Sequence, residues 1–535
     1  MSLAPDVQAQ AARPPVPLYT DLGTHHYAVS TRVPQAQRYF DQGLRLYYAF
    51  NHAEAIRSFT EAARLDPQCA MCYWGSALAH GPNINAPMDS ASAVQAYADV
   101  QQAVARQSQA SPVERALIRA LTARYARVPA ADRAALDSAY ARAMAQVAGE
   151  FPGDPETATL YAEALMDLSP WNYWQRGEPR PDTPELLARL EGVIARQPNH
   201  PGACHFYIHA VEAVHPDRAV PCAERLAALM PGAGHLVHMP GHIYIRVGRY
   251  ADAIRANEHA VHADETYIRD QRPGAGTYTL GYYPHNYDFL AFAAAMAGRG
   301  DQAIHAARTV SSLIPAEALD QPGTRHLQHH FTRPMQILVR LERWDEVLRA
   351  PAPAENLTHA RAIWHYARGR ALAARGDLPA AEAELARVRA AAQDPAMADM
   401  RLEFNSAPAI LAIAADVLAG SIASARGDAD AAVQHLNDAV RREDELLYGE
   451  PPEWSVPVRQ DLGAVLLAHG RAAEAERAFR EDLARFPENG WSLTGLARAL
   501  RAQGRTADAA GVEARLRIAW PDGHGSATHA DHGSH

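Results

Sequence analysis

Apolar residues recur at the three- and four-residue spacing of a helix face along almost the whole chain, and no run shows the strict alternation of a strand. Short polar turns interrupt this pattern, and most of them begin with Gly-Arg or Gly-Asp. They lie at residues 248–254, 298–304, 343–348, 376–382, 427–433, 470–476 and 504–510. The pattern therefore predicts an all-α chain built from successive helix hairpins.

Two stretches, residues 38–67 and 456–487, carry small residues, a phenylalanine and a final proline at matching positions. These are Gly43, Ala55, Phe59, Ala62 and Pro67 in the first stretch, and Gly463, Ala475, Phe479 and Pro487 in the second. A small residue lets two antiparallel helices approach closely, and a proline ends the second helix. The spacing resembles the signature of the tetratricopeptide repeat (TPR) superfamily over most of residues 35–520. The resemblance implies a TPR-like α-solenoid, a right-handed superhelix of hairpins with a deep groove.

On this basis the chain divides into six regions. They are an N-terminal extension (1–34), TPR-like units with an Asn/Pro loop (35–90), degenerate helical hairpins (91–195), central His-rich units (196–350), C-terminal units (351–520) and a disordered His-rich tail (521–535). Two insertions, at 80–89 and 169–184, are longer than a plain scaffold needs. They either roof a pocket or connect imperfect repeats.

Composition excludes some classes of protein. The chain has 535 residues, of which 48% are hydrophobic and 21% charged, so it can bury a sizeable core. Its net charge is −10 and it has no block of basic residues, which predicts no nucleic-acid partner. No apolar run reaches the roughly 18 residues of a membrane helix, which predicts no membrane partner. There is no P-loop, dinucleotide turn, zincin motif or nucleophile elbow.

Cysteine usage leaves the compartment open. The four cysteines are too few for a disulfide scaffold. Cys69 and Cys72 are either a redox pair at a helix start or small residues needed for packing. Cys204 is either a soft metal ligand or a buried residue between helices. The N-terminus has no apolar segment typical of a signal peptide, so we expect a periplasmic protein if a signal has been removed and a cytoplasmic one otherwise.

The strongest chemical signal is a pair of His-x-x-x-His motifs in consecutive units, His205 with His209 and His238 with His242. The offset between the pairs is 33 residues, one TPR repeat. Residues four apart share a helix face. The TPR resemblance implies that first helices line the concave groove, with their second, fifth, ninth and twelfth residues facing it. Four imidazoles would then converge on one patch.

Other groups extend this predicted wall. His235, His285 and His329 take the second position of their units, Asp288 takes a fifth position, and Glu212 continues the stripe of His209. Neighbouring helices lie about 8–10 Å apart, so imidazoles on them could share a metal at roughly 2.0–2.1 Å. A site rich in imidazole favours copper or zinc, with iron possible.

These residues support three hypotheses. The first is a metal-dependent oxidoreductase or hydrolase acting on a small molecule or peptide in the groove. Its ligands would come from the seven histidines above, and Glu212 or Asp288 would be the base or would orient a ligand imidazole. The second is a TPR adaptor that binds a partner peptide without catalysis. The third is a metal-handling or storage protein.

The two ends of the chain add weaker signals. His25 and His26 precede the first repeat and are either extra ligands or solvated residues. In the tail, four histidines could bind metal loosely: His524, His529, His532 and His535. The chain also resembles bacterial TPR proteins that share openings of the type "THHYAVST", "FDQGLRLYYAFNHAEAIRSF", "CAMCYWG" and "GPNINAP". No activity is established for that group, so this likeness implies no reaction.

Overall fold

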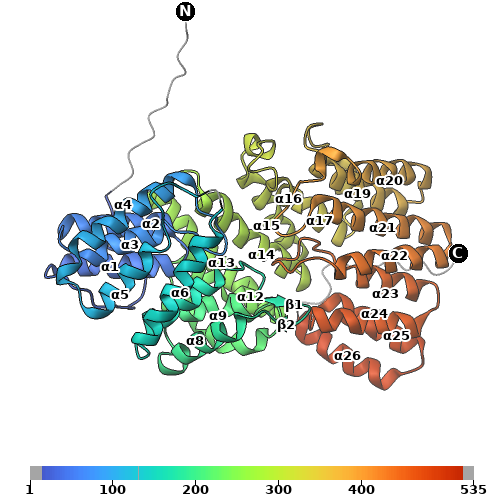
Figure 1. Cartoon of the computed structure of the whole chain (residues 1–535). Helices are drawn as coiled ribbons and strands as arrows, with labels where there is room; N and C mark the ends of the chain where they lie inside the picture. Colours follow the sequence, from blue (N-terminus) through green and yellow to red (C-terminus); the bar gives the residue numbers. More distant parts are fainter. Residues whose placement is uncertain (1–14, 131, 522–535) are drawn as a thin grey trace, which may run out of the picture. The chain divides into compact units, whose positions relative to one another are not determined.

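The structure is a computed structural model that describes residues 15–130 and 132–521, and these residues are almost entirely helical (Figure 1). The predicted all-α class of helix hairpins is confirmed. The tail histidines lie outside the described residues. The chain forms two compact units: Met1–Met239 with His259–Tyr283, and Pro240–Glu258 with Pro284–His535.

In the first unit, each helix from α1 to α10 packs on the next, and α9 also contacts α1 and α7. Its elements are α1 (Pro34–Tyr48), α2 (His52–Leu65), α3 (Ala70–Ala79), α4 (Ser90–Arg106), η1 (Gln107–Gln109), α5 (Pro112–Thr122), α6 (Ala134–Glu150), α7 (Pro155–Met166), β1 (Trp174–Gln175), β2 (Glu178–Pro179), α8 (Thr183–Arg196), α9 (Pro201–Val211), η2 (Pro216–Ala219), α10 (Val220–Leu229), α11 (Gly234–His238) and the π-helix η3 (Tyr278–Tyr282).

In the second unit, α21 to α26 form a layered series in which each helix packs on the next (Figure 1). Its elements are α12 (Pro240–Arg246), α14 (Tyr283–Met296), α15 (Gly300–Leu313), η4 (Ala316–Leu319), α16 (Leu327–Phe331), α17 (Arg333–Arg340), α18 (Trp344–Arg349), α19 (Thr358–Ala374), α20 (Leu378–Ala392), η5 (Pro395–Met397), α21 (Ala407–Arg426), α22 (Ala429–Asp444), α23 (Val458–Ala468), α24 (Ala472–Arg485), α25 (Gly490–Ala502) and α26 (Thr506–Ala519). The helix α13 (Tyr250–Gln271) contributes residues to both units.

The predicted turns share one backbone feature, a residue with positive φ. Six of the seven turns use glycine for it: Gly248, Gly298, Gly376, Gly427, Gly470 and Gly504. Glycine adopts this conformation without steric cost, which explains why it marks the turns in the sequence. The seventh turn uses Glu342 (φ 52°), and the turn of the first hairpin, which is not one of these seven, uses Phe50 (φ 54°).

The glycines within the helices form niches for a phenylalanine ring. A Cβ on Gly43 or Gly75 would lie 2.7 or 2.4 Å from the ring of Phe59. The same niche recurs in the C-terminal hairpins, where Cβ atoms on Gly463 and Gly495 would lie 2.6 and 2.2 Å from Phe479. Only glycine therefore allows these helices to pack this closely, as the repeat spacing predicts.

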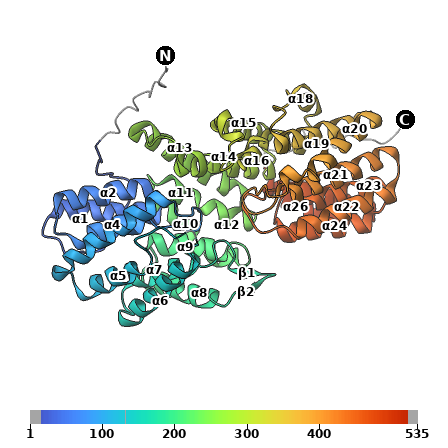
Figure 2. The same ribbon diagram turned by 45° about the horizontal axis from the view of Figure 1, so that its top comes forward.

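Two features differ from the sequence-based expectation. Residues 169–184 contain a short antiparallel ladder, β1 with β2, which lies beside α8 (Figure 2). Each strand has only two residues, too few to show alternation in the sequence. In addition, α21 is long and apolar enough to cross a membrane by length and composition, with a mean hydropathy of 1.7. Because 67% of that window is buried, it has the burial of a core helix.

The glycine niche gives a direct stability prediction. Replacing Gly463→Ala should lower the thermal midpoint, because the added methyl group would overlap Phe479 and overpacking costs about 1–3 kcal/mol. The control is Gly511→Ala in α26, where a Cβ meets nothing within 4 Å. That variant should be unchanged or slightly more stable, since alanine favours helix. Equal midpoints for the two variants, measured by circular dichroism, would contradict the packing argument.

Candidate metal centre

Helix α9 carries the first predicted histidine pair, and its sequence explains its position. His200 caps its N-terminus by accepting from the amide of Ala203 at 3.1 Å, and Pro201 occupies the first turn. Gly202 lets the ring of Tyr48 approach, since a Cβ there would lie 2.4 Å from that ring. The C-terminal end of α1 is thereby brought against α9, one turn from His205.

Three imidazoles converge in the first unit: His205 and His209 from α9, and His235 from α11. One ring nitrogen of each lies within 4.8 Å of one from each of the others. The ring centroid of His205 lies 5.0 Å from that of His209 and 5.0 Å from that of His235. His205 Nε2 is 3.2 Å from His235 Nε2. All three side chains are buried, at 3% exposure or less. This cluster could hold a metal ion.

The backbone selects which nitrogen of His205 faces the cluster. His205 Nδ1 lies 2.6 Å from the carbonyl oxygen of Tyr48. A carbonyl oxygen only accepts, so Nδ1 carries the proton and donates. In the neutral ring the lone pair is then on Nε2, the atom that faces His235. This is the arrangement that a metal-binding imidazole needs.

A carboxylate holds the second imidazole. His209 Nδ1 lies 3.2 Å from Glu212 Oε1, and Glu212 is fully buried at the C-terminal end of α9. A carboxylate that accepts from Nδ1 leaves Nε2 as the ligand nitrogen and increases its basicity. The position of Glu212 thus fits the predicted orienting role.

Aromatic side chains enclose the three imidazoles. The ring of Phe50 lies 4.4, 6.2 and 5.4 Å from those of His205, His209 and His235, between centroids. Trp171 meets His209 edge-on at 5.0 Å and donates to Asn85 Oδ1 at 2.9 Å.

The two insertions therefore meet each other beside the cluster, because Asn85 belongs to 80–89 and Trp171 to 169–184. Of the two alternatives for these segments, the contact with His209 favours the roof.

The other predicted ligands lie elsewhere. His238 is next to His235, with ring centroids 5.8 Å apart, but it is not a member of the three-imidazole cluster. His242 and His285 belong to the second unit, with ring centroids 5.8 Å apart and Phe289 against both. His242 Nδ1 also lies 3.0 Å from Glu450. Burial lowers the pKa of His285 to about 4.

Asp288 lies in an ion-pair network rather than in a position to act as a base. Arg333 contacts both of its carboxylate oxygens, at 2.5 and 2.7 Å, and His330 Nδ1 lies 3.3 Å away. Burial alone would raise the pKa of Asp288, but the charge of Arg333 and the bond with His330 hold it below its ordinary value. A carboxylate of low pKa is a poor proton acceptor, so this geometry argues against the predicted catalytic role.

His329 pairs with a histidine that the sequence did not single out. His329 Nδ1 lies 3.4 Å from His359 Nε2, and both rings are buried. Burial lowers both pKa values, that of His359 to about 3. The two rings are therefore neutral at physiological pH.

A second cluster, also unpredicted, lies in the first unit. His25 Nε2 and His200 Nε2 lie 2.9 and 3.1 Å from the same oxygen, Glu156 Oε1, and Tyr48 donates to the other oxygen. Burial alone would raise the pKa of Glu156, but its histidine partners hold it below its ordinary value. His25 is therefore not a solvated residue but contacts Glu156, whereas His26 is half exposed and bonds Asp41 at 2.8 Å.

The two clusters differ in their tautomers. His200 Nδ1 accepts from the amide of Ala203, so its proton is on Nε2 and is donated to Glu156. That nitrogen has no lone pair for a metal. No sequence pattern signals this cluster, because His25, Glu156 and His200 come from three distant segments.

All four cysteines form disulfides, a pairing that the sequence did not predict, since four cysteines are too few for a disulfide scaffold. Cys69 pairs with Cys72, and Cys204 on α9 pairs with Cys222 on α10, with Cα atoms 5.4 and 5.2 Å apart. Cys204 is therefore not a soft metal ligand. It ties the helix that carries His205 and His209 to its neighbour.

No family model matches the chain, and no curated protein matches it. Among solved structures, the human IFIT1 dimer with m7Gppp-AAAA is 12% identical, with 91% of each chain covered and a TM-score of 0.32. The APC/C hetero-tetramer Cut9-Hcn1 is 14% identical over 87% of this chain and 76% of that chain, with a TM-score of 0.30. Similarity at this level assigns no function to this chain, and the exclusion of nucleic acid stays a prediction.

The disulfides can be tested by thiol labelling. Protein purified without reductant and alkylated in denaturant should carry no label, because all four sulfurs are paired. Reduction should expose four thiols and destabilise the first unit by about 3 kcal/mol through Cys204–Cys222, whose residues are 18 apart. Peptide mapping by mass spectrometry measures both pairings. A labelled cysteine before reduction would contradict this assignment.

Proposed function

We propose that this protein is a metal-dependent enzyme whose centre consists of His205, His209 and His235, with Glu212 as the residue that positions His209. One observation carries the proposal. His205 Nε2 and His235 Nε2 face each other at 3.2 Å, while the other nitrogen of His205 is committed to the carbonyl of Tyr48.

The spacing suits a shared transition metal. With metal–nitrogen distances of about 2.05 Å and tetrahedral angles, two ligand nitrogens lie roughly 3.3 Å apart. The same distance suits an N–H···N hydrogen bond from His235 to His205 in the metal-free protein. To bind metal through Nε2, a neutral His235 would carry its proton on Nδ1 instead. Protonation of a ligand imidazole competes with the metal, so binding should weaken as the pH falls. Imidazole ligands favour zinc or copper.

Three protein ligands leave one position of a tetrahedral metal for water or substrate, as in catalytic rather than structural zinc sites. The bound metal would supply a Lewis acid towards an oxygen at that position. The protein's own contribution is to hold His205 through the Tyr48 carbonyl and His209 through Glu212, and to exclude bulk water with Phe50 and Trp171. Buried surroundings strengthen the electrostatic effects of such a site.

Space for a small molecule lies close by in the same unit. A cavity of about 900 Å³ is lined by residues on either side of Phe50, namely Ala49 and Asn51, and on either side of His235, namely Ala233 and Val237. Most of its other lining residues are apolar or tyrosine, such as Leu46, Tyr267 and Tyr278, and Asp21, Asp270, His259 and His262 add polar groups. Such a lining suits a largely apolar small molecule or peptide segment.

The two disulfides support export to an oxidising compartment, such as the periplasm, because disulfides are rare in the reducing cytosol. Zinc and copper chemistry at buried imidazoles is compatible with that location.

Metal content tests the centre. The protein should retain about one equivalent of Zn²⁺ or Cu²⁺ after dialysis against a weak chelator, which removes metal held loosely by the tail. The double variant His205→Gln/His235→Gln should lose it, because two of three ligands are gone, while circular dichroism shows the fold retained. Elemental analysis by mass spectrometry measures the content.

The matched control is His25→Gln, which alters the second histidine cluster. It should keep the full metal content, since that cluster is held together by donation to Glu156. Metal retained by the double variant, or lost equally by the control, would contradict the assignment.

The positioning role of Glu212 gives a graded effect. Glu212→Gln should weaken metal affinity about 10–100-fold without changing the stoichiometry at saturation, because the ligand remains but its orientation and basicity are lost. Competition titration with a chromophoric chelator measures the affinity. An unchanged affinity would exclude Glu212 from the centre, and a loss of stoichiometry would make it a direct ligand.

A further inference from the structure

The cavity of about 900 Å³ in the first unit has a negatively charged wall. Asp21 and Asp270 line it, and none of the described residues that line it is an arginine or a lysine. Arg269 donates to both carboxylate oxygens of Asp270, at 2.8 and 3.2 Å. Asp21 is exposed, and no arginine of the described residues pairs with it. Asp21 is therefore the carboxylate that a ligand in the cavity can reach.

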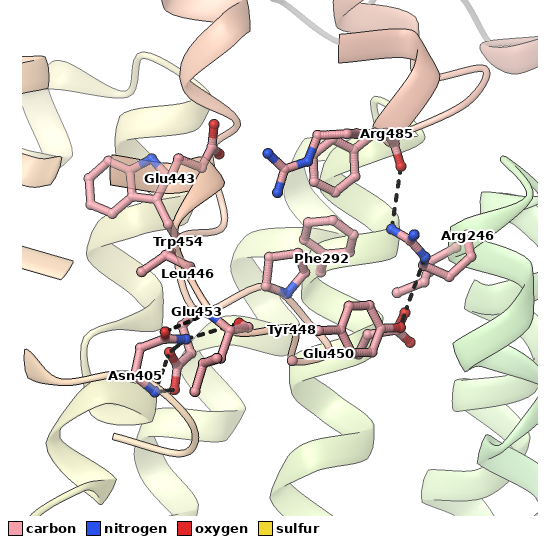
Figure 3. Close-up of a pocket in the computed structure, with 15 residues that line it drawn as sticks. Arg246, Phe292, Asn405, Glu443, Leu446, Tyr448, Glu450, Glu453, Trp454 and Arg485 are labelled. Atoms are coloured by element: carbon pink, nitrogen blue, oxygen red, sulfur yellow. Dashed lines mark hydrogen bonds and ion pairs between the residues drawn. The ribbon is translucent and has the colours of Figure 1, made fainter. Parts of the chain in front are cut away.

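The pocket of the second unit has a different charge pattern. It measures about 140 Å³, and two arginines, Arg246 and Arg485, line it together with its glutamates (Figure 3). Arg246 Nε lies 3.7 Å from Glu450 Oε1. An acid of that pocket thus already has a cationic partner in the chain, whereas Asp21 has none among the described residues.

The segment that carries Asp21 is fixed against the rest of the unit. The amide of Tyr19 donates to Gln42 Oε1 at 2.9 Å, and the amide of Gly232 donates to the carbonyl oxygen of Asp21, also at 2.9 Å. A Cβ on Gly232 would overlap the carboxylate of Asp21, so this side chain lies directly against the backbone there. Because Gly232 also lines the cavity, the carboxylate is held at its wall.

Two buried tyrosines, Tyr267 of α13 and Tyr278 of η3, form a corner of the same cavity. Their ring centroids lie 5.1 Å apart and the rings stand at 66° to each other. Tyr267 donates its hydroxyl proton to Glu54 at 3.1 Å, and Tyr278 donates to Asp264 at 2.5 Å. Both carboxylates are fully buried. Since each hydroxyl proton is committed to a carboxylate, these side chains offer a ligand only acceptor oxygens and π electrons.

From this wall we propose that the cavity binds a small organic cation, an alkylated ammonium group with an apolar body. Asp21 would pair with the positive charge, and the rings of Tyr267 and Tyr278 would attract it, as aromatic rings attract a cation within about 6 Å of their centroids. The apolar part of the lining, which includes Leu46 and Val237, would surround the body. This assignment rests on the proposed function in taking the cation as the substrate of the metal centre, but its binding needs no metal.

The probe is choline, with 3,3-dimethyl-1-butanol as its uncharged isostere. Each is titrated into the full-length protein by isothermal calorimetry in the presence of a chelator, at pH 8, where an exposed imidazole is neutral. Choline should bind at least tenfold more tightly than the alcohol, because only choline carries the charge that Asp21 and the two rings recognise. Equal binding of the two compounds would overturn the proposal.

Asp21→Asn tests the carboxylate. It should weaken choline about tenfold and leave the alcohol unchanged, since the amide keeps the shape and removes the charge. The matched control is Asp217→Asn in η2, an exposed acid that does not line the cavity, and it should bind choline as the unaltered protein does. Unchanged choline binding in Asp21→Asn would exclude this carboxylate and overturn the assignment.

Two substitutions of Tyr267 separate the ring from the hydroxyl group. Tyr267→Phe and Tyr267→Leu both lose the bond to Glu54, but only the leucine variant loses the ring, so choline should bind it about fivefold more weakly than the phenylalanine variant. Equal affinities would contradict the aromatic contact. Choline bound by protein that retains no metal would leave the cavity assignment standing without the metal centre. Retained metal with no preference for choline would overturn the ligand alone.

Discussion

The close approach of antiparallel helices, made possible where glycine faces an aromatic ring, is the constraint on which this architecture depends. Phe59 fills the niche between Gly43 and Gly75, and a methyl group at either position would overlap its ring. The same interaction occurs at the candidate metal centre, where the absence of a side chain at Gly202 leaves room for the ring of Tyr48. Because the helices meet this closely, a backbone carbonyl of one hairpin reaches an imidazole on another helix.

The turn of the first hairpin differs from the other turns, and the difference suits the candidate metal centre. Where most turns place glycine, this one places Phe50 with φ 54°. A left-handed conformation costs a bulky residue roughly 1–2 kcal/mol, so something must offset it. The ring packs against His205, His209 and His235, which provides that compensation and forms an apolar wall beside the three imidazoles.

Local spacing predicts the fold and the pair of histidines on α9, because both follow from helical periodicity and from glycine at turns. It does not select the third imidazole. Counting repeat positions favoured His238 as a partner of His205, whereas His235 lies at 3.2 Å. The disulfides and the contacts of Tyr48 and Trp171 could not be predicted either, since they join segments far apart in the chain and depend on how the hairpins stack.

Hydrogen-bond partners distinguish the two histidine clusters of the first unit, although both place ring nitrogens within reach of one ion. A carbonyl oxygen takes the Nδ1 proton of His205 and leaves Nε2 with a lone pair. A backbone amide donates to Nδ1 of His200, which fixes the proton on Nε2 and directs it to Glu156. Proximity alone would rank the clusters equally. The tautomer that each backbone contact imposes makes the cluster of His205 the better candidate for metal binding, and it suits the cluster of His200 to hydrogen bonding with Glu156.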